Sequence, residues 1–166
     1  MAAPRELVWG WFFEEVDPGC RIELGMTVGE AQLASAVAAF GDPGPNHVDE
    51  EHAAAGRFGA RVVHGPVTLG VMTSVLGQYF GQSIVALRDL SGQFRSPVYV
   101  GDTLRCEWRV VSKEPRERLA GGGLLGMEGA AMVRRDGKHV VCVECEATLA
   151  VGARSVLEPV LVERRS

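Results

Sequence analysis

The stretch from residue 66 to residue 80 carries no charged side chain, and no other feature of the chain restricts its fold as much. Pro66 suits the first position of a helix, where its missing N–H would have no partner in any case. A helix that is apolar on every face has to be buried. The run also contains glutamine, serine, threonine and glycine, so it is a core helix and not a membrane span. We therefore expect a helix over residues 66–80 that other parts of the chain surround.

Strand patterns dominate the chain after this helix. Apolar and charged residues alternate from 104 to 110, as expected of a strand with one buried face. The segments 124–135 and 138–151 flank Asp136-Gly137, which is a strong signal for a two-residue hairpin turn. Further strand segments are predicted over residues 20–24, 84–90 and 93–100. This inventory predicts an α+β fold in which an antiparallel sheet curls around a long central helix.

The chain of 166 residues is long enough to bury a core and short enough for one domain. We assign all of it to a single domain, with a core over residues 12–151 and a polar tail over 152–166. The net charge of -4, with acids and bases mixed, argues against nucleic acid or an anionic membrane as a partner. No apolar run at the N-terminus resembles a signal peptide, so we expect a cytoplasmic protein.

The four cysteines give no argument for a metal or redox site. Cys142 and Cys145 have the Cys-x-x-Cys spacing, but they lie within a predicted strand, where residues three apart point to opposite faces. Neither a second pair nor a histidine at metal-ligand spacing follows them. We therefore expect reduced thiols and no bound metal.

Two helices are predicted before the central one. The pattern from Thr27 to Glu30 is a capping box, and the helix that it opens should stop near Phe40 or Gly41, because the next residue precedes a proline. A short second helix is expected between Asp49, as its cap, and Gly56.

Asp42 and His47 lie between these helices in a segment that two prolines stiffen. A carboxylate and an imidazole at this spacing can reach one water molecule, as general acid–base catalysis requires. Each also has an ordinary alternative: Asp42 can hydrogen-bond the turn that it begins, and His47 can be a loop histidine. Gly65 lies at the start of the uncharged helix, where N–H groups lack partners and the helix dipole is positive. It is therefore a candidate donor to a negatively charged oxygen.

These residues also have the spacing of a known family. The chain contains Gly41-Asp42-Pro43-Gly44-Pro45-Asn46-His47-Val48-Asp49, then Ala53-Ala54, Phe58 and Val63-His64-Gly65. It resembles the MaoC-like dehydratases and (R)-specific enoyl-CoA hydratases, which have the hot-dog fold. Segments 13–19, 94–98 and 101–104 resemble further parts of the family pattern, so the likeness covers most of residues 12–151. Gly44 departs from the motif, which has asparagine there; rate or substrate preference would change if that side chain orients the aspartate or the water.

The resemblance implies a function and a site. The function is reversible hydration of a trans-2-enoyl thioester, carried by CoA or acyl-carrier protein, to an (R)-3-hydroxyacyl thioester. In the family the Asp/His pair activates water and a glycine N–H polarises the thioester oxygen, which gives these roles to Asp42, His47 and Gly65. His64 either orients the loop or contacts substrate, and the Thr73 hydroxyl faces substrate or bonds its own helix. Phe58 is a further substrate-binding candidate.

The resemblance also implies a homodimer or higher homo-oligomer, with the acyl tunnel at the subunit interface, and no metal or redox cofactor. Two other interpretations stay open. A hot-dog thioesterase would use a carboxylate to direct water at the carbonyl, although such enzymes usually lack this Asp/His loop. A non-catalytic acyl-thioester-binding module or partner subunit is kept open by Gly44 and Pro43.

Overall fold

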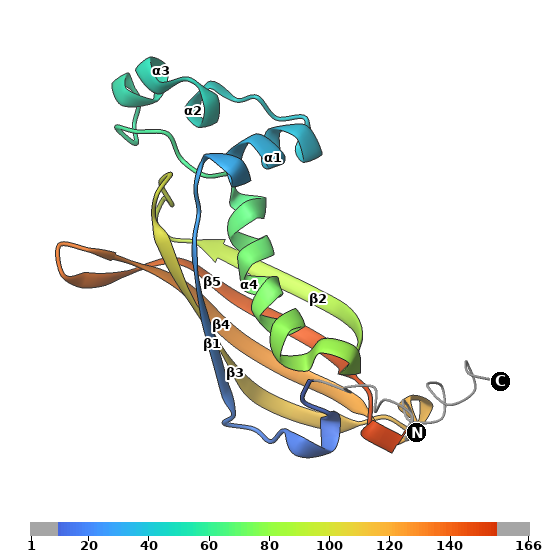
Figure 1. Cartoon of the computed structure of the whole chain (residues 1–166). Helices are drawn as coiled ribbons and strands as arrows, with labels where there is room; N and C mark the ends of the chain where they lie inside the picture. The colour runs from blue at the N-terminus through green and yellow to red at the C-terminus, as the bar shows by residue number, and fades with distance from the viewer. Residues whose placement is uncertain (1–9, 156–166) are drawn as a thin grey trace, which may run out of the picture.

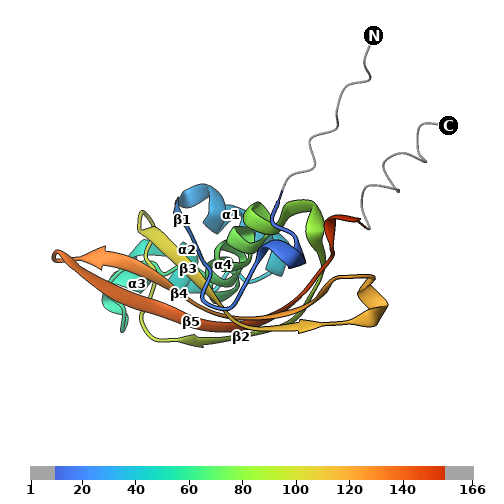
Figure 2. The same ribbon diagram turned by 90° about the horizontal axis from the view of Figure 1, so that it is seen from below.

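The long helix α4 (Gly65–Phe80) is the centre of the molecule, and a five-stranded antiparallel sheet lies along one side of it (Figure 1). The computed structural model describes residues 10–155. The strand order is β1-β3-β4-β5-β2, so β1 and β2 form the edges, and Figure 2 shows the sheet curving around α4. The predicted sheet around a central helix is thereby confirmed. The strands are β1 (Arg21–Thr27), β2 (Ile84–Phe94), β3 (Thr103–Pro115), β4 (Gly123–Arg135) and β5 (Lys138–Val151).

The hairpin of β4 and β5 forms as its turn residues predict. Asp136 and Gly137 both have positive φ, 50° and 75°, which gives a turn whose twist matches that of the flanking strands. Arg135 then pairs with Lys138, and the ladder continues to the far end of both strands. This local turn therefore fixes the register as far as Met132, where an irregularity in the ladder shifts the pairing by one residue.

One face of α4 packs into the sheet. Its buried side chains include Val71, Met72, Val75, Leu76 and Phe80. Trp108 on β3 is 1% exposed, and its indole N–H donates to the Met72 carbonyl at 2.8 Å. The large ring therefore lies in the core without leaving its polar atom unpaired.

The opposite face of α4 is left open by residues 10–155. Its exposed residues are Pro66, Gly70, Ser74, Gly77 and Gln78. The prediction that the helix is buried on all sides is therefore wrong for a single chain, because this face avoids charge with small and uncharged polar residues. The helix also begins at Gly65, one residue earlier than predicted.

The sheet differs from the prediction at β2. This strand is continuous from residue 84 to residue 94, so the prediction of two separate strands over 84–90 and 93–100 is wrong. Residues 95–102 leave the sheet, and Tyr99 then pairs with Val62 in an isolated bridge. Pro97 has no N–H to give to a strand ladder, which is consistent with the early end of β2.

The prediction of a capping box at Thr27 is also wrong. Thr27 is the last residue of β1, and helix α1 (Glu30–Phe40) is preceded by Gly29, whose N–H donates to the Gln32 side chain at 2.9 Å. The end of α1 is as predicted, because Gly41 follows it with a left-handed φ of 66°.

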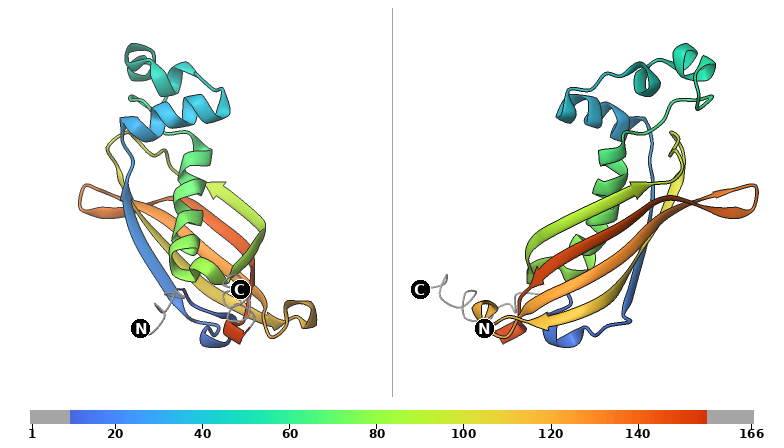
Figure 3. Two further views of the ribbon diagram at one scale, coloured as in Figure 1. Left: turned by 45° about the vertical axis from the view of Figure 1, so that its right-hand side comes forward. Right: turned by 180° about the vertical axis from the view of Figure 1, so that it is seen from behind.

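Three helices form an overhang beyond the end of the sheet, next to the N-terminus of α4 (Figures 1 and 3). Asp49 caps the third helix as predicted, accepting the His52 N–H at 2.9 Å. The side chains of the overhang are mostly exposed, and its buried residues are Leu33, Ala36 and Ala53. The overhang consists of α1, α2 (Pro45–Val48) and α3 (Glu50–Ala55) with their connections.

The remaining elements are three single turns, η1 (Phe13–Glu15), η2 (Gly81–Ser83) and η3 (Glu117–Leu119). All four cysteines are free thiols, as predicted. Within the described residues, no helix has the length and apolar character that a membrane crossing needs. Residues 156–166 of the predicted tail lie outside the described part of the chain.

Candidate active site

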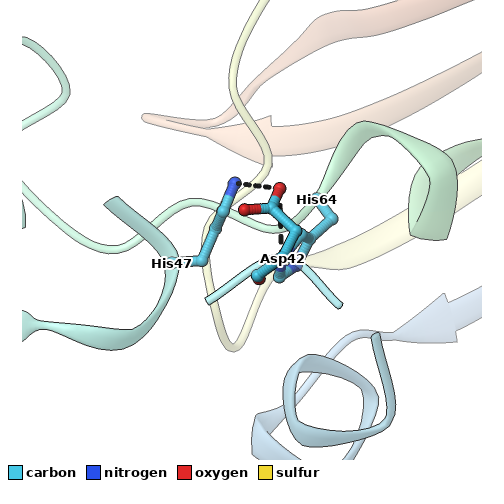
Figure 4. A group of neighbouring side chains, drawn as sticks. All are labelled: Asp42, His47 and His64. Atoms are coloured by element: carbon cyan, nitrogen blue, oxygen red, sulfur yellow. Dashed lines mark hydrogen bonds and ion pairs between the residues drawn. The ribbon is translucent and has the colours of Figure 1, made fainter. Parts of the chain in front are cut away.

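Asp42 and His47 meet because two short-range signals bend the chain between α1 and α2. Asp42 precedes a proline and cannot continue α1, while Pro45 begins the single turn of α2 that carries His47. The Gly44 N–H donates to Asp42 Oδ1 at 3.0 Å, which holds the carboxylate against its own turn. Figure 4 shows the carboxylate of Asp42 next to the imidazole of His47.

The imidazole of His47 has a defined tautomer. Its Nδ1 lies 2.7 Å from the Val62 carbonyl, which can only accept a hydrogen bond, so the ring proton is on Nδ1. The bare Nε2 lies 3.9 Å from Asp42 Oδ2. That separation is too long for a hydrogen bond, but a water about 2.8 Å from each atom would join them at an angle of about 90°. His47 and Asp42 can therefore hold one water molecule between a carboxylate and an unprotonated ring nitrogen.

His64 completes a cluster with these two residues. Its side chain is 2% exposed, and its Nε2 lies 2.9 Å from the Asp42 carbonyl and 3.9 Å from Asp42 Oδ2. The ring stacks on His47 with centroids 3.7 Å apart and planes at 22°. His64 therefore contacts both members of the predicted pair, which makes it a central residue of the cluster.

Gly65 follows His64 and is the first residue of α4, where a backbone N–H has no partner within the helix. A Cβ added at Gly65 would lie 3.0 Å from Cζ of Phe94, the last residue of β2. Phe94 therefore covers the Gly65 backbone, although its side chain is 55% exposed. The sequence did not point to Phe94 as a site residue, because nothing local links a strand end to a helix start.

The other two candidates make different contacts. The Phe58 carbonyl accepts the Tyr99 hydroxyl at 3.0 Å, and its ring lies under the Arg57 guanidinium, 5.7 Å away. The Thr73 hydroxyl donates to the Gly70 carbonyl at 3.0 Å, so it bonds its own helix. Of the predicted site residues, the structure brings Asp42, His47 and His64 together next to Gly65; the substrate-binding roles of Phe58 and Thr73 stay predictions.

Gly44 departs from the family motif within the cluster itself. A Cβ at this position would lie 3.0 Å from Asp42 Oδ1 and 3.3 Å from His47 Cδ2. A side chain here would thus contact both residues. In this chain the backbone N–H of Gly44 contacts Asp42.

Asp42, His47 and His64 each offer one ligand atom within 4.8 Å of one another, so a metal has to be considered. The carboxylate oxygen is 3.9 Å from either imidazole Nε2. Neighbouring ligands of a tetrahedral zinc lie only about 3.3 Å apart, and His64 Nε2 already faces a backbone carbonyl. The spacing fits a bridging water better, and the expected lack of a metal stays a prediction.

The cluster is open to solvent in a single chain, since the Asp42 side chain is 56% exposed. Two hollows of about 610 and 540 Å³ lie elsewhere, on the face of the sheet that points away from α4. Charged side chains such as Glu107, Arg109 and Glu128 line the larger one, and neither includes a residue of the cluster.

Comparison with known proteins agrees with this fold. The family profile described as "MaoC like domain" matches residues 13–122. An (R)-specific enoyl-CoA hydratase of Rhodospirillum rubrum is 28% identical over 108 residues, 65% of this chain and 75% of that protein. A 3-hydroxybutyryl-CoA dehydratase of Methylorubrum extorquens is 28% identical over 109 residues, 66% of this chain and 69% of that protein. The structure of an (R)-hydratase from Aeromonas caviae, 25% identical, superimposes with a TM-score of 0.71 over 83% of this chain and 98% of that chain. The chain therefore belongs to the MaoC-like domain family, with its hot-dog fold.

Proposed function

We propose that the chain catalyses the reversible addition of water to a trans-2-enoyl thioester, which gives an (R)-3-hydroxyacyl thioester. The observation that carries this proposal is the geometry of the pair: His47 Nδ1 faces the Val62 carbonyl, and His47 Nε2 lies 3.9 Å from Asp42 Oδ2, a separation that one bridging water can span. The names of the relatives, an enoyl-CoA hydratase and a hydroxybutyryl-CoA dehydratase, support the same reaction class.

In the hydration direction, the Asp42 and His47 pair takes a proton from the bound water as its oxygen attacks the β carbon. The same pair then delivers a proton to the α carbon. Dehydration follows these steps in reverse.

The thioester oxygen gains negative charge when water adds, and the backbone N–H of Gly65 is the proposed donor to it. A helix N-terminus favours such charge through its unpaired N–H groups and its dipole. One preorganised donor of this kind contributes about 3 kcal/mol to lowering a barrier. The thioester thus serves as the electron sink, and we propose that the reaction needs no metal or redox cofactor.

We further propose that the chain acts as a homodimer whose second copy closes the acyl tunnel. The cluster is open in one chain, and the outer face of α4 beside it carries only small or uncharged residues. The edge strand β2 exposes the apolar residues Val85 (60%), Leu87 (42%) and Phe94 (55%) next to a backbone edge that pairs with no other described strand. Such an edge needs a cover, and a second copy of β2 is the simplest one.

The substrate is proposed to arrive on CoA or an acyl-carrier protein in the cytoplasm. The four free thiols support a reducing compartment.

The proposal is tested with crotonyl-CoA and the purified protein. Hydration removes the ultraviolet absorbance of the conjugated thioester without releasing a thiol, and an (R)-specific 3-hydroxyacyl dehydrogenase should accept the product. Thiol release would instead indicate a thioesterase, and saturable binding without turnover would indicate an acyl-binding module. A series of enoyl-CoAs from short to steroid-sized acyl groups then defines the substrate range.

A further inference from the structure

His64 is a buried histidine with one nitrogen that lacks a partner. Its Nδ1 has no hydrogen bond to any described residue and is shielded from solvent. A buried polar atom without a partner lowers the stability of the fold, so a residue that keeps one usually has another role. The contacts of the rest of the ring indicate what this role is.

The first contact is to the backbone of Asp42. The Asp42 carbonyl lies 2.9 Å from His64 Nε2, and because a carbonyl only accepts, the ring proton is on Nε2. Asp42 is followed by a proline, which has no N–H to anchor the segment. His64 therefore ties the turn that carries the carboxylate to the start of α4.

The second contact is to the ring of His47. The two imidazoles are stacked, with centroids 3.7 Å apart and an interplanar angle of 22°. The hydrogen bond from His47 Nδ1 to the Val62 carbonyl fixes one edge of that ring, and the stack with His64 fixes its plane. Residues 62–64 thereby determine both the tautomer and the orientation of His47.

Few side chains can make both contacts. Glutamine can place a donor near the position of Nε2 but has no ring to stack. Phenylalanine can stack but has no donor for the Asp42 carbonyl. Imidazole does both, at the expense of a buried Nδ1 without a partner.

We propose that His64 is the positioning residue of this site: its Nε2–H holds the Asp42 backbone while its ring holds the plane of His47, so that both groups face one water. The role in catalysis rests on the proposed function. His64 itself transfers no proton, because Nε2 is occupied by the carbonyl and Nδ1 is buried.

The test uses His64→Phe and His64→Gln, each of which keeps one contact, with the exposed His52→Gln as the matched control. Each His64 variant should lower kcat for crotonyl-CoA about 10- to 100-fold, since small misplacements of catalytic groups have effects of this size. The KM should stay within about threefold, because substrate binding is left intact. A purely structural, space-filling role would leave His64→Phe at the wild-type kcat, and that result overturns the proposal.

Imidazole ¹⁵N NMR of the substrate-free protein gives a readout that does not depend on turnover. In the wild type, His64 should show the Nε2–H tautomer and His47 the Nδ1–H tautomer. In His64→Gln, which loses the stack that holds the plane of His47 against the Val62 carbonyl, His47 should shift toward a mixture of tautomers, whereas in His64→Phe, which keeps the stack, His47 should stay as in the wild type. A wild-type His64 with its proton on Nδ1, or an unchanged His47 in His64→Gln, refutes the positioning role. If His47 shifts as expected but the wild type does not hydrate crotonyl-CoA, the positioning role stands and the proposed reaction fails.

Discussion

Replacing Asp42 with asparagine separates the chemical role of its carboxylate from its structural role. Oδ1 accepts the Gly44 N–H at 3.0 Å, and an asparagine oxygen can keep that bond. Oδ2, which faces His47 Nε2 at 3.9 Å, becomes an NH₂ group that donates and cannot accept a proton. The substitution therefore preserves the turn and removes the basic oxygen that faces the water.

The expected effects on activity and stability differ widely in size. Loss of one member of an acid–base pair lowers rates about 10²- to 10⁴-fold, which corresponds to about 2.7–5.4 kcal/mol of barrier. The side chain is 56% exposed and keeps its one hydrogen bond, so the free energy of unfolding should change by less than about 1 kcal/mol. Asp42→Asn should thus be a folded protein with almost no activity.

The assay measures kcat and KM from the loss of crotonyl-CoA absorbance, with Tm from circular dichroism on the same samples. Asp49→Asn is the matched control, because it makes the same chemical change in a nearby exposed helix cap that asparagine fills equally well. An Asp42→Asn protein that retains more than about a tenth of the wild-type kcat would contradict the assigned role of the carboxylate.

Three further predictions follow from other parts of the structure. Gly44→Ala should reduce kcat about 3- to 10-fold, because the added Cβ would lie 3.0 Å from Asp42 Oδ1. It should not lower Tm, because the φ of −51° at this position suits any residue. An unchanged kcat would contradict this prediction. Leu87→Glu, on the exposed edge strand β2, should convert the proposed dimer to a monomer in light-scattering measurements. The control Val111→Glu, on the inner strand β3, should leave the dimer intact. A Leu87→Glu protein that is still a dimer would refute the β2 interface. Burial raises the pKa of the Cys106 thiol to about 12 and that of Cys145 to about 11, from 9.0. As the pH rises, these thiols therefore lose their protons in the unfolded chain before they do so in the folded protein, and the free energy of unfolding should fall above pH 9.0. A double variant, Cys106→Ala with Cys145→Ala, should show a smaller fall.

The parts of the fold that neighbouring residues determine could be predicted from the sequence. Asp136-Gly137 specified the hairpin turn, and Gly41 with the proline after Asp42 specified the end of α1. The Asp42 and His47 pair belongs to this class, because the turn that joins them lies within six residues of chain. The local prediction fails at Thr27, because this residue pairs in strand β1 and does not cap a helix.

Features that depend on distant residues could not be predicted in the same way. The tautomer of His47 is set by the Val62 carbonyl, and Phe94 reaches Gly65 only because the end of β2 lies beside the start of α4. The open face of α4 could not be predicted either, because small uncharged residues suit a buried face and a subunit interface equally well. The sequence therefore predicted that Asp42 and His47 lie close together better than it predicted what surrounds them.

The position of the overhang has a consequence for heat inactivation. Asp42 and His47 belong to a segment with three buried side chains, Leu33, Ala36 and Ala53, whereas Gly65 belongs to a helix packed on the sheet. Units with few buried contacts open at lower free energy than the core that they adjoin. Warming should therefore switch catalysis off before the sheet melts, and cooling should restore it for as long as the sheet has stayed intact.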